Sequence, residues 1–195
     1  MQKFYSTNAV TENAKKAKEA ADRLFPEEEW KMLEERIFIS RRRPTSKIKT
    51  GYENEIRDAI IIRDLGGTVY LVPEIRNSDV NQFDAIVNGL EMEFKNQSGA
   101  SILTLKNHFL RSREQAPNVF INLENSPLSK HKIISALIAA RNSPEYIKKN
   151  KFTEGGIIIL KIRGQENLSC MDIKKTGRFM RPMDWRGGML PSQPR

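Results

Sequence analysis

The N-terminal part of the chain has apolar residues at the three- and four-residue spacing of an amphipathic helix. This spacing predicts a helix from about Thr11 to Ile39, with a break near Pro26. A basic segment containing proline follows at 41–49, and it fits either a solvated connector or a strap that holds phosphate groups. The apolar positions that define the two helical faces are Ala17, Ala20, Ala21, Leu24 and Phe25, then Trp30, Leu33 and Ile37.

After residue 50 the pattern changes to one helix followed by short strands. Apolar residues at helical spacing predict a helix over Tyr52–Leu65, which ends at the pair Gly66-Gly67. Segments rich in β-branched and aromatic residues predict three strands, at 68–72, 82–87 and 90–95. Asn88-Gly89 is a strong signal for a two-residue turn, so the last two of these strands are predicted to form a hairpin.

The second half of the chain alternates helices with apolar strands. Helices are predicted at 102–116 and 129–141, and strands at 118–123 and 156–162. The basic tail from Gly164 onward contains several glycines and is predicted to be a loosely ordered extension. The residues expected to face the core from the two helices are Leu103, Phe109, Leu110, Ile133, Ile134, Leu137 and Ile138.

These elements predict an α/β fold with a central mixed sheet flanked by helices on both faces. The core is expected at 51–163, after an N-terminal helical segment and basic linker at 1–50 and before the C-terminal extension at 164–195. A chain of 195 residues is long enough for one domain with a substantial core plus such additions. The sequence of the N-terminal segment is equally compatible with a role in delivery, in docking or in oligomerisation.

The composition, with 38% hydrophobic and 29% charged residues, is that of a charged, soluble globular protein. A net charge of +9 favours a polyanionic partner, because neutralised phosphates release counterions; the alternative is that the charge serves solubility only. Cys170 is the single cysteine, which excludes an intramolecular disulfide and a cysteine-based zinc site.

No segment of the chain has the pattern of a membrane or secretory element. The N-terminus lacks the apolar region of a signal peptide, and stretches such as Ile157–Leu160 are too short to span a bilayer. We therefore expect no membrane partner and a cytoplasmic, reducing site of action.

Three residues with complementary chemistry are predicted to meet on one face of the hairpin. Glu93 and Lys95 are two residues apart on a strand, so both side chains point to the same side of the sheet, together with Glu91. Asp84 lies four positions before the Asn88-Gly89 turn and Glu93 lies four after it, which places these two carboxylates nearly opposite each other. Apolar neighbours indicate a buried sheet, where charged groups need a specific reason.

This set of residues is suited to phosphodiester hydrolysis. Two close carboxylates repel each other unless a cation or a shared proton lies between them. A small number of hard oxygen ligands favours Mg²⁺ or Mn²⁺, and the backbone carbonyl of Phe94 adds a further oxygen. A lysine beside such a site orients or activates water and neutralises charge on the reacting phosphate. The alternative for Glu93 and Lys95 is a solvated ion-pair face without chemistry.

His108 and His131 are the only histidines, and both fall in predicted helices among ordinary helix residues. Such positions favour structural roles. The number of histidines alone does not exclude a ribonuclease mechanism in which two histidines act as general acid and general base.

The stretches NEIRDAIIIRDLGGTVYLVPEIRN, QFDAIVNGLEMEFKNQ and REQAPNVFINL resemble the PD-(D/E)XK phosphodiesterase superfamily. More narrowly, they are similar to the C-terminal tRNA nuclease domains of contact-dependent growth inhibition toxins. Shared features are a first-helix glutamate, a strand ending in Pro-Glu, an aspartate before an Asn-Gly turn, Glu-x-Lys, and a helix leading through Gln-Ala into an apolar strand. The resemblance covers 51–163 and implies a restriction-endonuclease-like core. Phe83 replaces the proline of the motif, which sets backbone shape and carries no chemistry.

The resemblance implies roles for individual residues. Asp84 and Glu93, with the carbonyl of Phe94, are expected to bind the metal, and Lys95 is the expected catalytic lysine. Glu55 is expected to be the first-helix carboxylate, reaching the metal directly or through water. Glu53 and Glu74 compete for that role, and the residues expected to contact substrate are Lys106, Arg111, Arg113 and Gln115. For Gln115 the alternative is a helix-terminal capping or solvent-facing residue.

The favoured function is therefore a metal-dependent, toxin-like endonuclease acting on RNA, with tRNA as the substrate implied by the resemblance. A DNA endonuclease of the same fold is the nearest alternative, because a fold does not determine a substrate. A non-catalytic nucleic-acid-binding protein of a mobile element is an alternative of a different class. If the chain is a toxin domain, the resemblance also implies a cognate immunity protein as a partner, acidic where it covers the basic face.

Overall fold

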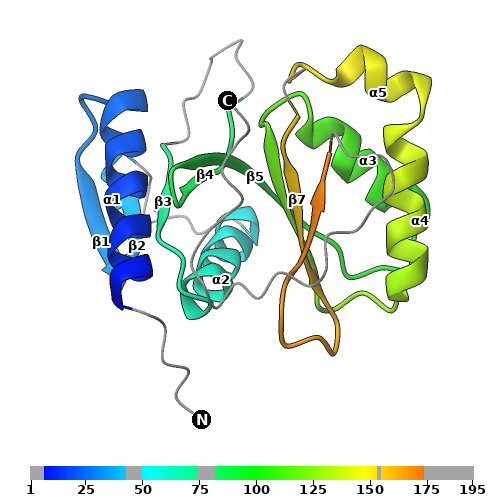
Figure 1. Ribbon diagram of the computed structural model, residues 1–195, viewed down its shortest axis with the longest axis horizontal. Coiled ribbons are helices and arrows are strands. Elements are labelled where there is room, and N and C mark those ends of the chain that lie inside the picture. The colour runs from blue at the N-terminus through cyan, green and yellow to red at the C-terminus, as the bar shows by residue number, and fades with distance from the viewer. Residues whose placement is uncertain (1–6, 43–49, 74–81, 153–154, 174–195) are drawn as a thin grey trace. The chain divides into compact units, whose positions relative to one another are not determined.

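The computed structural model describes residues 7–42, 50–73, 82–152 and 155–173 (Figure 1). The chain divides into two compact units, and the division falls between Glu91 and Met92. Each unit combines helices with mixed β-strands, so the predicted α/β class is confirmed. None of the described helices is both long enough and apolar enough to cross a bilayer.

In its described residues, the first unit has two helices and four strands in the order β1-β2-β3-β4. The first and last pairs of strands are antiparallel, and β2 and β3 are parallel. The elements are α1 (Thr7–Leu24), β1 (Trp30–Glu34), β2 (Ile37–Ser40), α2 (Thr50–Asp64), β3 (Val69–Leu71) and β4 (Ala85–Val87).

The predicted helix up to Ile39 is wrong beyond its first part. After α1 the chain forms a β1–β2 hairpin, and Arg36 in its turn has a φ of 60°. Trp30, Leu33 and Ile37 reproduce a helical spacing by coincidence. The pattern that decides the local structure is the alternation in β2, where Ile37 and Ile39 are buried and Phe38 is only partly so.

Helix α1 packs closely on β3 and β4 because its buried face is made of alanines. Ala17, Ala20 and Ala21 contact a cluster that includes Tyr70 and Ile86, as their spacing predicted. The same close approach explains Gly89, because a Cβ at this position would lie 3.1 Å from the carbonyl oxygen of Lys16. The φ of Gly89 is +90°, which is a second reason for glycine here.

The second unit places three helices beside strands in the order β5-β6-β7-β8 (Figure 1). Strands β5, β6 and β7 are parallel, and β8 is antiparallel to β7. Serine side chains cap α3, α4 and α5 at their N-termini. The elements are β5 (Leu90–Asn96), α3 (Ile102–Ser112), β6 (Asn118–Leu123), α4 (Lys130–Arg141), α5 (Pro144–Lys149), β7 (Ile157–Ile162) and β8 (Ser169–Asp172).

The core of the second unit differs from the prediction at two places. Leu103 is 68% exposed and Leu105 is buried instead, so the buried apolar face of α3 is formed by Leu105, Phe109 and Leu110. Ile133 and Leu137 are buried as predicted, whereas Ile134 and Ile138 are only partly so. Strand β8 lies within the tail that was predicted to be loosely ordered, and the rest of that tail, 174–195, lies outside the described residues.

Strand β8 carries Cys170, opposite Ile159 of β7. Burial raises the pKa of the Cys170 thiol to about 12, and the charge of Asp172 acts in the same direction. We expect the native protein not to react with 5,5′-dithiobis(2-nitrobenzoate) at pH 8, because about one thiol in 10⁴ is ionised there. The unfolded chain in guanidinium should release one equivalent of chromophore. A fast reaction of the native protein would contradict the packing of β8.

Candidate active site

The Glu-x-Lys pair lies on β5 in the second unit. Glu93 is 1% exposed, the Lys95 side chain is 20% exposed, and Lys95 Nζ forms an ion pair with Glu93 Oε1. Parallel pairing with β6 sets Glu93 beside Val119 and Lys95 beside Ile121. Between them, Phe94 turns to the other side and packs edge-on against Phe120, with ring centroids 5.7 Å apart.

A buried carboxylate beside an ammonium group is not an ordinary surface ion pair. Removing a carboxylate from water costs several kcal/mol, roughly, unless a cation and hydrogen bonds compensate. Lys95 supplies one positive charge, and its side chain is partly exposed to solvent, whereas the Glu93 side chain is enclosed. The solvated ion-pair face considered from the sequence therefore does not describe Glu93.

Helix α3 adds positive charge close to Lys95. Burial lowers the pKa of His108, and the positive charges of Lys95 and Arg111 lower it further. The His108 imidazole is therefore neutral at pH 7 and lies within electrostatic reach of both residues. Arg111 is exposed and Lys106 partly exposed, and Gln115 follows the end of the helix, where its backbone N–H donates to Ser112.

Arg113 has a position different from the one predicted for a substrate contact. Its guanidinium is fully buried and donates to the side chain of Asn150 and to several backbone carbonyls. Burial lowers the pKa of Arg113, and its charged form is held by this dense set of acceptors. It joins the end of α3 to the loop before β7. The carbonyls that accept its hydrogen bonds belong to Ala116, Pro117, Phe152 and Gly155.

In the first unit, α2 carries the predicted Glu55, which is partly buried. Asp58, three residues further on the same helical face, is fully buried, and the sequence reasoning missed it. The available signal was an aspartate among the apolar residues of a predicted core helix. Among the two competitors of Glu55, Glu53 is exposed, and Glu74 lies outside the described residues.

Asp84 lies one residue before β4 rather than within it. Its carbonyl accepts a hydrogen bond from the backbone N–H of Val72, at 3.1 Å, so the local pairing continues past the strand. The predicted turn is confirmed, since Asn88 and Gly89 have φ values of 50° and 90° between β4 and β5. The predicted meeting of Asp84 with Glu93 joins residues of different units and stays a prediction.

The donor set fits a hard divalent cation in its chemistry. Carboxylates and a backbone carbonyl are the oxygen ligands that Mg²⁺ and Mn²⁺ take, with water and phosphate completing the shell. Among the described residues, no three His, Cys, Asp or Glu side chains form a group that could hold a metal ion. The ligands expected from the sequence are the side chains of Asp84 and Glu93 and the backbone carbonyl of Phe94. They include two carboxylate side chains, whereas a group of that kind needs at least three such side chains.

No family model matches the chain, and no curated protein matches it. A solved structure described as the CdiA-CT/CdiI toxin and immunity complex from Burkholderia pseudomallei has a chain that is 19% identical. The match has a TM-score of 0.47 and covers 66% of this chain and 92% of that chain.

Replacing Arg113 tests its internal position. Arg113→Met should lower the free energy of unfolding by more than about 3 kcal/mol, because several buried acceptors lose their donor at roughly 1–3 kcal/mol each. Arg111→Met, an equal charge change two residues away at an exposed position, should alter it by about 0.5 kcal/mol or less. Urea denaturation followed by circular dichroism measures both. Equal effects would mean that Arg113 is not an internal anchor.

Proposed function

We propose that this chain is a metal-dependent endonuclease with Glu93 and Lys95 at its active site. The observation that supports this proposal most is the burial of Glu93 next to Lys95 on β5. A protein that only binds nucleic acid gains nothing from an enclosed carboxylate, since negative charge repels phosphate. A metal-dependent hydrolase does gain, because an enclosed carboxylate can hold the metal ion and an ammonium group offsets the charge that develops on the scissile phosphate.

Glu93, Asp84 and the carbonyl of Phe94 would hold Mg²⁺ or Mn²⁺, which supplies Lewis-acid activation when bound. Lys95 donates a hydrogen bond to the attacking water or to a non-bridging phosphate oxygen, and its charge offsets the negative charge that develops there. Glu55 of α2 would reach that metal directly or through water, and Asp58 is an additional candidate on the same helical face.

The substrate is a nucleic acid, held by positive charge. Lys106 and Arg111 of α3 lie in the same unit as Lys95, and Gln115 follows them. Contacts of this kind bind backbone phosphates without reading sequence. RNA, and tRNA in particular, is favoured over DNA by the sequence resemblance to toxin domains. That resemblance also supports a cytoplasmic site of action and an immunity protein as cognate partner.

Lys95→Met should lower the rate of RNA cleavage in Mg²⁺ by at least about 10²-fold, because one charge-stabilising donor is lost. The matched control is Lys161→Met. Lys161 is also on a strand of the second unit, its side chain is 14% exposed, and it lies 4.0 Å from Glu124. It should retain near wild-type activity. Cleavage of labelled tRNA and of plasmid DNA, with thiol protection of Cys170 as the test of folding, measures both.

EDTA should abolish this cleavage, and added Mn²⁺ or Mg²⁺ should restore it. Cleavage that persists in EDTA and in Lys95→Met, but is lost in His108→Ala, would replace the metal mechanism by a histidine-based one. Nucleic acid that is bound but never cleaved in either metal would favour the non-catalytic alternative. Faster cleavage of plasmid than of tRNA would assign DNA as the substrate.

The first-helix carboxylate is tested by two charge-equivalent changes on α2. Glu55→Gln should lower activity by roughly 10- to 100-fold, the range seen when a group supporting a metal site is lost. Glu53→Gln, at an exposed position on the same helix, should change activity less than about twofold. Initial rates of tRNA cleavage in Mg²⁺ compare the two. The opposite order would assign the role to Glu53.

A further inference from the structure

Helix α3 covers the side of the sheet on which Lys95 lies. Lys95 is in register with Ile121 of β6, and Ile121 is in register with Leu160 of β7, so the three side chains point to the same side. Ile121 and Leu160 belong to the core cluster that contains Leu105 of α3. The side chain of Lys95 therefore lies beside the helix that carries His108, within the second unit (Figure 1).

His108 lies at the boundary between the buried and the exposed side of α3. Residues three apart are neighbours on a helix surface, and along such a row Leu105 is buried, His108 is partly buried and Arg111 is exposed. The row therefore runs from the sheet to solvent. The turn is fixed by Ser112, whose Oγ donates a hydrogen bond to the backbone carbonyl of His108 at 2.7 Å. Because the imidazole is partly exposed, a ligand at this surface can contact it.

The charges that act on His108 are positive. Burial lowers the pKa of the imidazole, and the charges of Lys95 and Arg111 lower it further. Helix α3 contains no acidic residue, and β6 contains no charged residue. Helix α4, which packs against α3, has only basic titratable residues, which are Lys130, His131, Lys132 and Arg141.

The carboxylates of the elements around α3 do not balance this positive charge. Glu93 is enclosed and paired with Lys95, and Glu114, which follows α3, lies 3.0 Å from Lys149. Glu145 of α5 is exposed. None of these three carboxylates is among the groups that shift the pKa of His108. An anion bound beside the imidazole would therefore be attracted by a field that these side chains leave positive.

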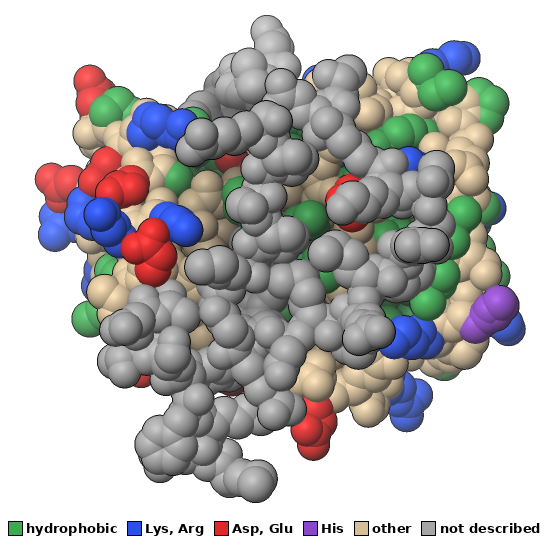
Figure 2. All heavy atoms as spheres, viewed as in Figure 1, with side chains coloured by type: hydrophobic (Ala, Val, Ile, Leu, Met, Phe, Trp, Pro, Cys, Tyr) green, Lys and Arg blue, Asp and Glu red, His purple; other side chains and the backbone are tan. Residues whose placement is uncertain are grey.

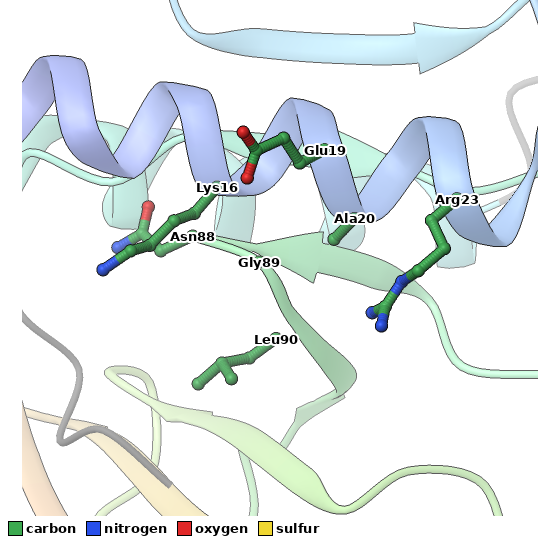
Figure 3. Close-up of a pocket in the computed structure, with 7 residues that line it drawn as sticks. All are labelled: Lys16, Glu19, Ala20, Arg23, Asn88, Gly89 and Leu90. Atoms are coloured by element: carbon green, nitrogen blue, oxygen red, sulfur yellow. The ribbon is translucent and has the colours of Figure 1, made fainter.

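The pocket between α1 and the turn before β5 has no such excess of positive charge (Figure 3). Lys16 and Arg23 line it, but they are roughly two helical turns apart and cannot contact one phosphate together. Glu12 lies 3.4 Å from Lys16, and Glu19 also lines the pocket. Figure 2 shows acidic and basic side chains interspersed in this part of the surface. The surface around His108 is therefore better suited to a phosphate.

We propose that His108 contacts a backbone phosphate of the bound nucleic acid, on the surface that runs from Lys95 to Arg111. The imidazole donates a hydrogen bond to a phosphate oxygen, and the two neighbouring cations contribute charge attraction. The inference rests on the proposed function for the identity of the ligand. It adds His108 to the residues that bind substrate, whereas Lys95 remains the group that acts on the reacting phosphate.

A phosphate beside His108 changes the sign of the charge around the imidazole. In the free protein the imidazole is neutral at pH 7, because burial and two cations lower its pKa. The negative charge of a phosphate raises that pKa again, so the complex takes up a proton that the free protein does not hold. Since the pKa is higher in the complex, affinity should increase as the pH falls through the pKa of the complex, and should level off below the pKa of the free protein.

The proton uptake is measured directly by nuclear magnetic resonance. His108 and His131 are the only histidines, and His131→Gln assigns the two ring signals of ¹³C-histidine-labelled protein. The signals are followed between about pH 5 and pH 8 in EDTA, with and without saturating tRNA. The pKa of His108 should rise by about 1 when tRNA is bound, roughly a tenfold change in proton affinity. An unchanged pKa of His108, or no binding of tRNA, would overturn the proposal.

Two matched histidine variants test the same contact through affinity. His131 is exposed and lies on α4 of the same unit, so His131→Gln is the control for His108→Gln. Binding of fluorescein-labelled tRNA is measured by anisotropy in EDTA at about pH 6 and pH 8. At the lower pH, His108→Gln should bind at least about fivefold more weakly than His131→Gln, because a charge-assisted hydrogen bond is lost. The difference should be smaller at the higher pH.

Equal tRNA affinities of the two variants at both pH values, with Cys170 still protected from thiol reagent, would contradict the contact. If His108→Gln does not fold, the measurement on the wild-type protein still decides. Inorganic phosphate at the same ionic strength separates two sources of the ligand. A rise in the pKa of His108 with inorganic phosphate, but not with tRNA, would overturn the assignment to nucleic acid.

Binding measurements in EDTA separate this contact from the nuclease proposal. If cleavage in Mg²⁺ is never observed but tRNA still raises the pKa of His108, the nuclease proposal fails and the phosphate contact stands. If tRNA is cleaved but its binding leaves the pKa of His108 unchanged, the contact fails and the nuclease proposal stands. Loss of cleavage in His108→Gln with unchanged tRNA affinity would also overturn the contact, because the imidazole would then act in the chemical step.

Discussion

The burial of a charged pair on β5 imposes the strictest constraint on the second unit. An enclosed carboxylate is tolerated only if its neighbours keep it neutralised, and Lys95 does so from two residues along the same strand. The surrounding structure is arranged around that requirement. Phe94 anchors the strand on Phe120, and α3 returns the chain so that β6 pairs in parallel with β5. His108, lying close to two cations, is kept neutral, so α3 adds no further charge at that position.

The first unit depends on a constraint of a different kind, which is space rather than charge. Alanines on α1 and glycine in the turn before β5 allow backbone to approach backbone, and larger residues in either place would separate them. The same turn orders the Asn88 amide, because the backbone of Thr68 occupies its oxygen. The amide nitrogen of Asn88 is enclosed by the same packing and has no hydrogen-bond partner among the described residues.

Local patterns were sufficient for most elements. The strand at Asn118–Leu123, the helix capped by Ser129 and the Asn88-Gly89 turn follow from short-range chemistry, and each lies where the sequence predicted it. The β1–β2 hairpin was missed because three apolar residues happened to match a helical period.

The burial of two charged residues could not be predicted for another reason: Arg113 was expected to contact substrate, and Asp58 was not considered. Whether a charged side chain is buried depends on acceptors far away in the sequence, and those of Arg113 are up to 42 residues distant. Of the candidate site, the pairing of Glu93 with Lys95 follows from strand alternation, whereas the contribution of each unit to catalysis does not.

The guanidinium of Arg113 ties together segments that are otherwise only loops. Through one rigid, planar group it donates hydrogen bonds to Ala116 after α3, to Asn150 after α5 and to Gly155 before β7. We therefore expect these segments not to open one at a time. Releasing any of them removes hydrogen-bond acceptors from the buried guanidinium of Arg113, and its charge is then left without enough partners. In hydrogen exchange, the described amides at Ala116, Asn150 and Gly155 are expected to open together with the core, although none of these residues lies in a helix or strand. An insertion beside Ala116, Asn150 or Gly155 is consequently expected to be as disruptive as one in a central strand.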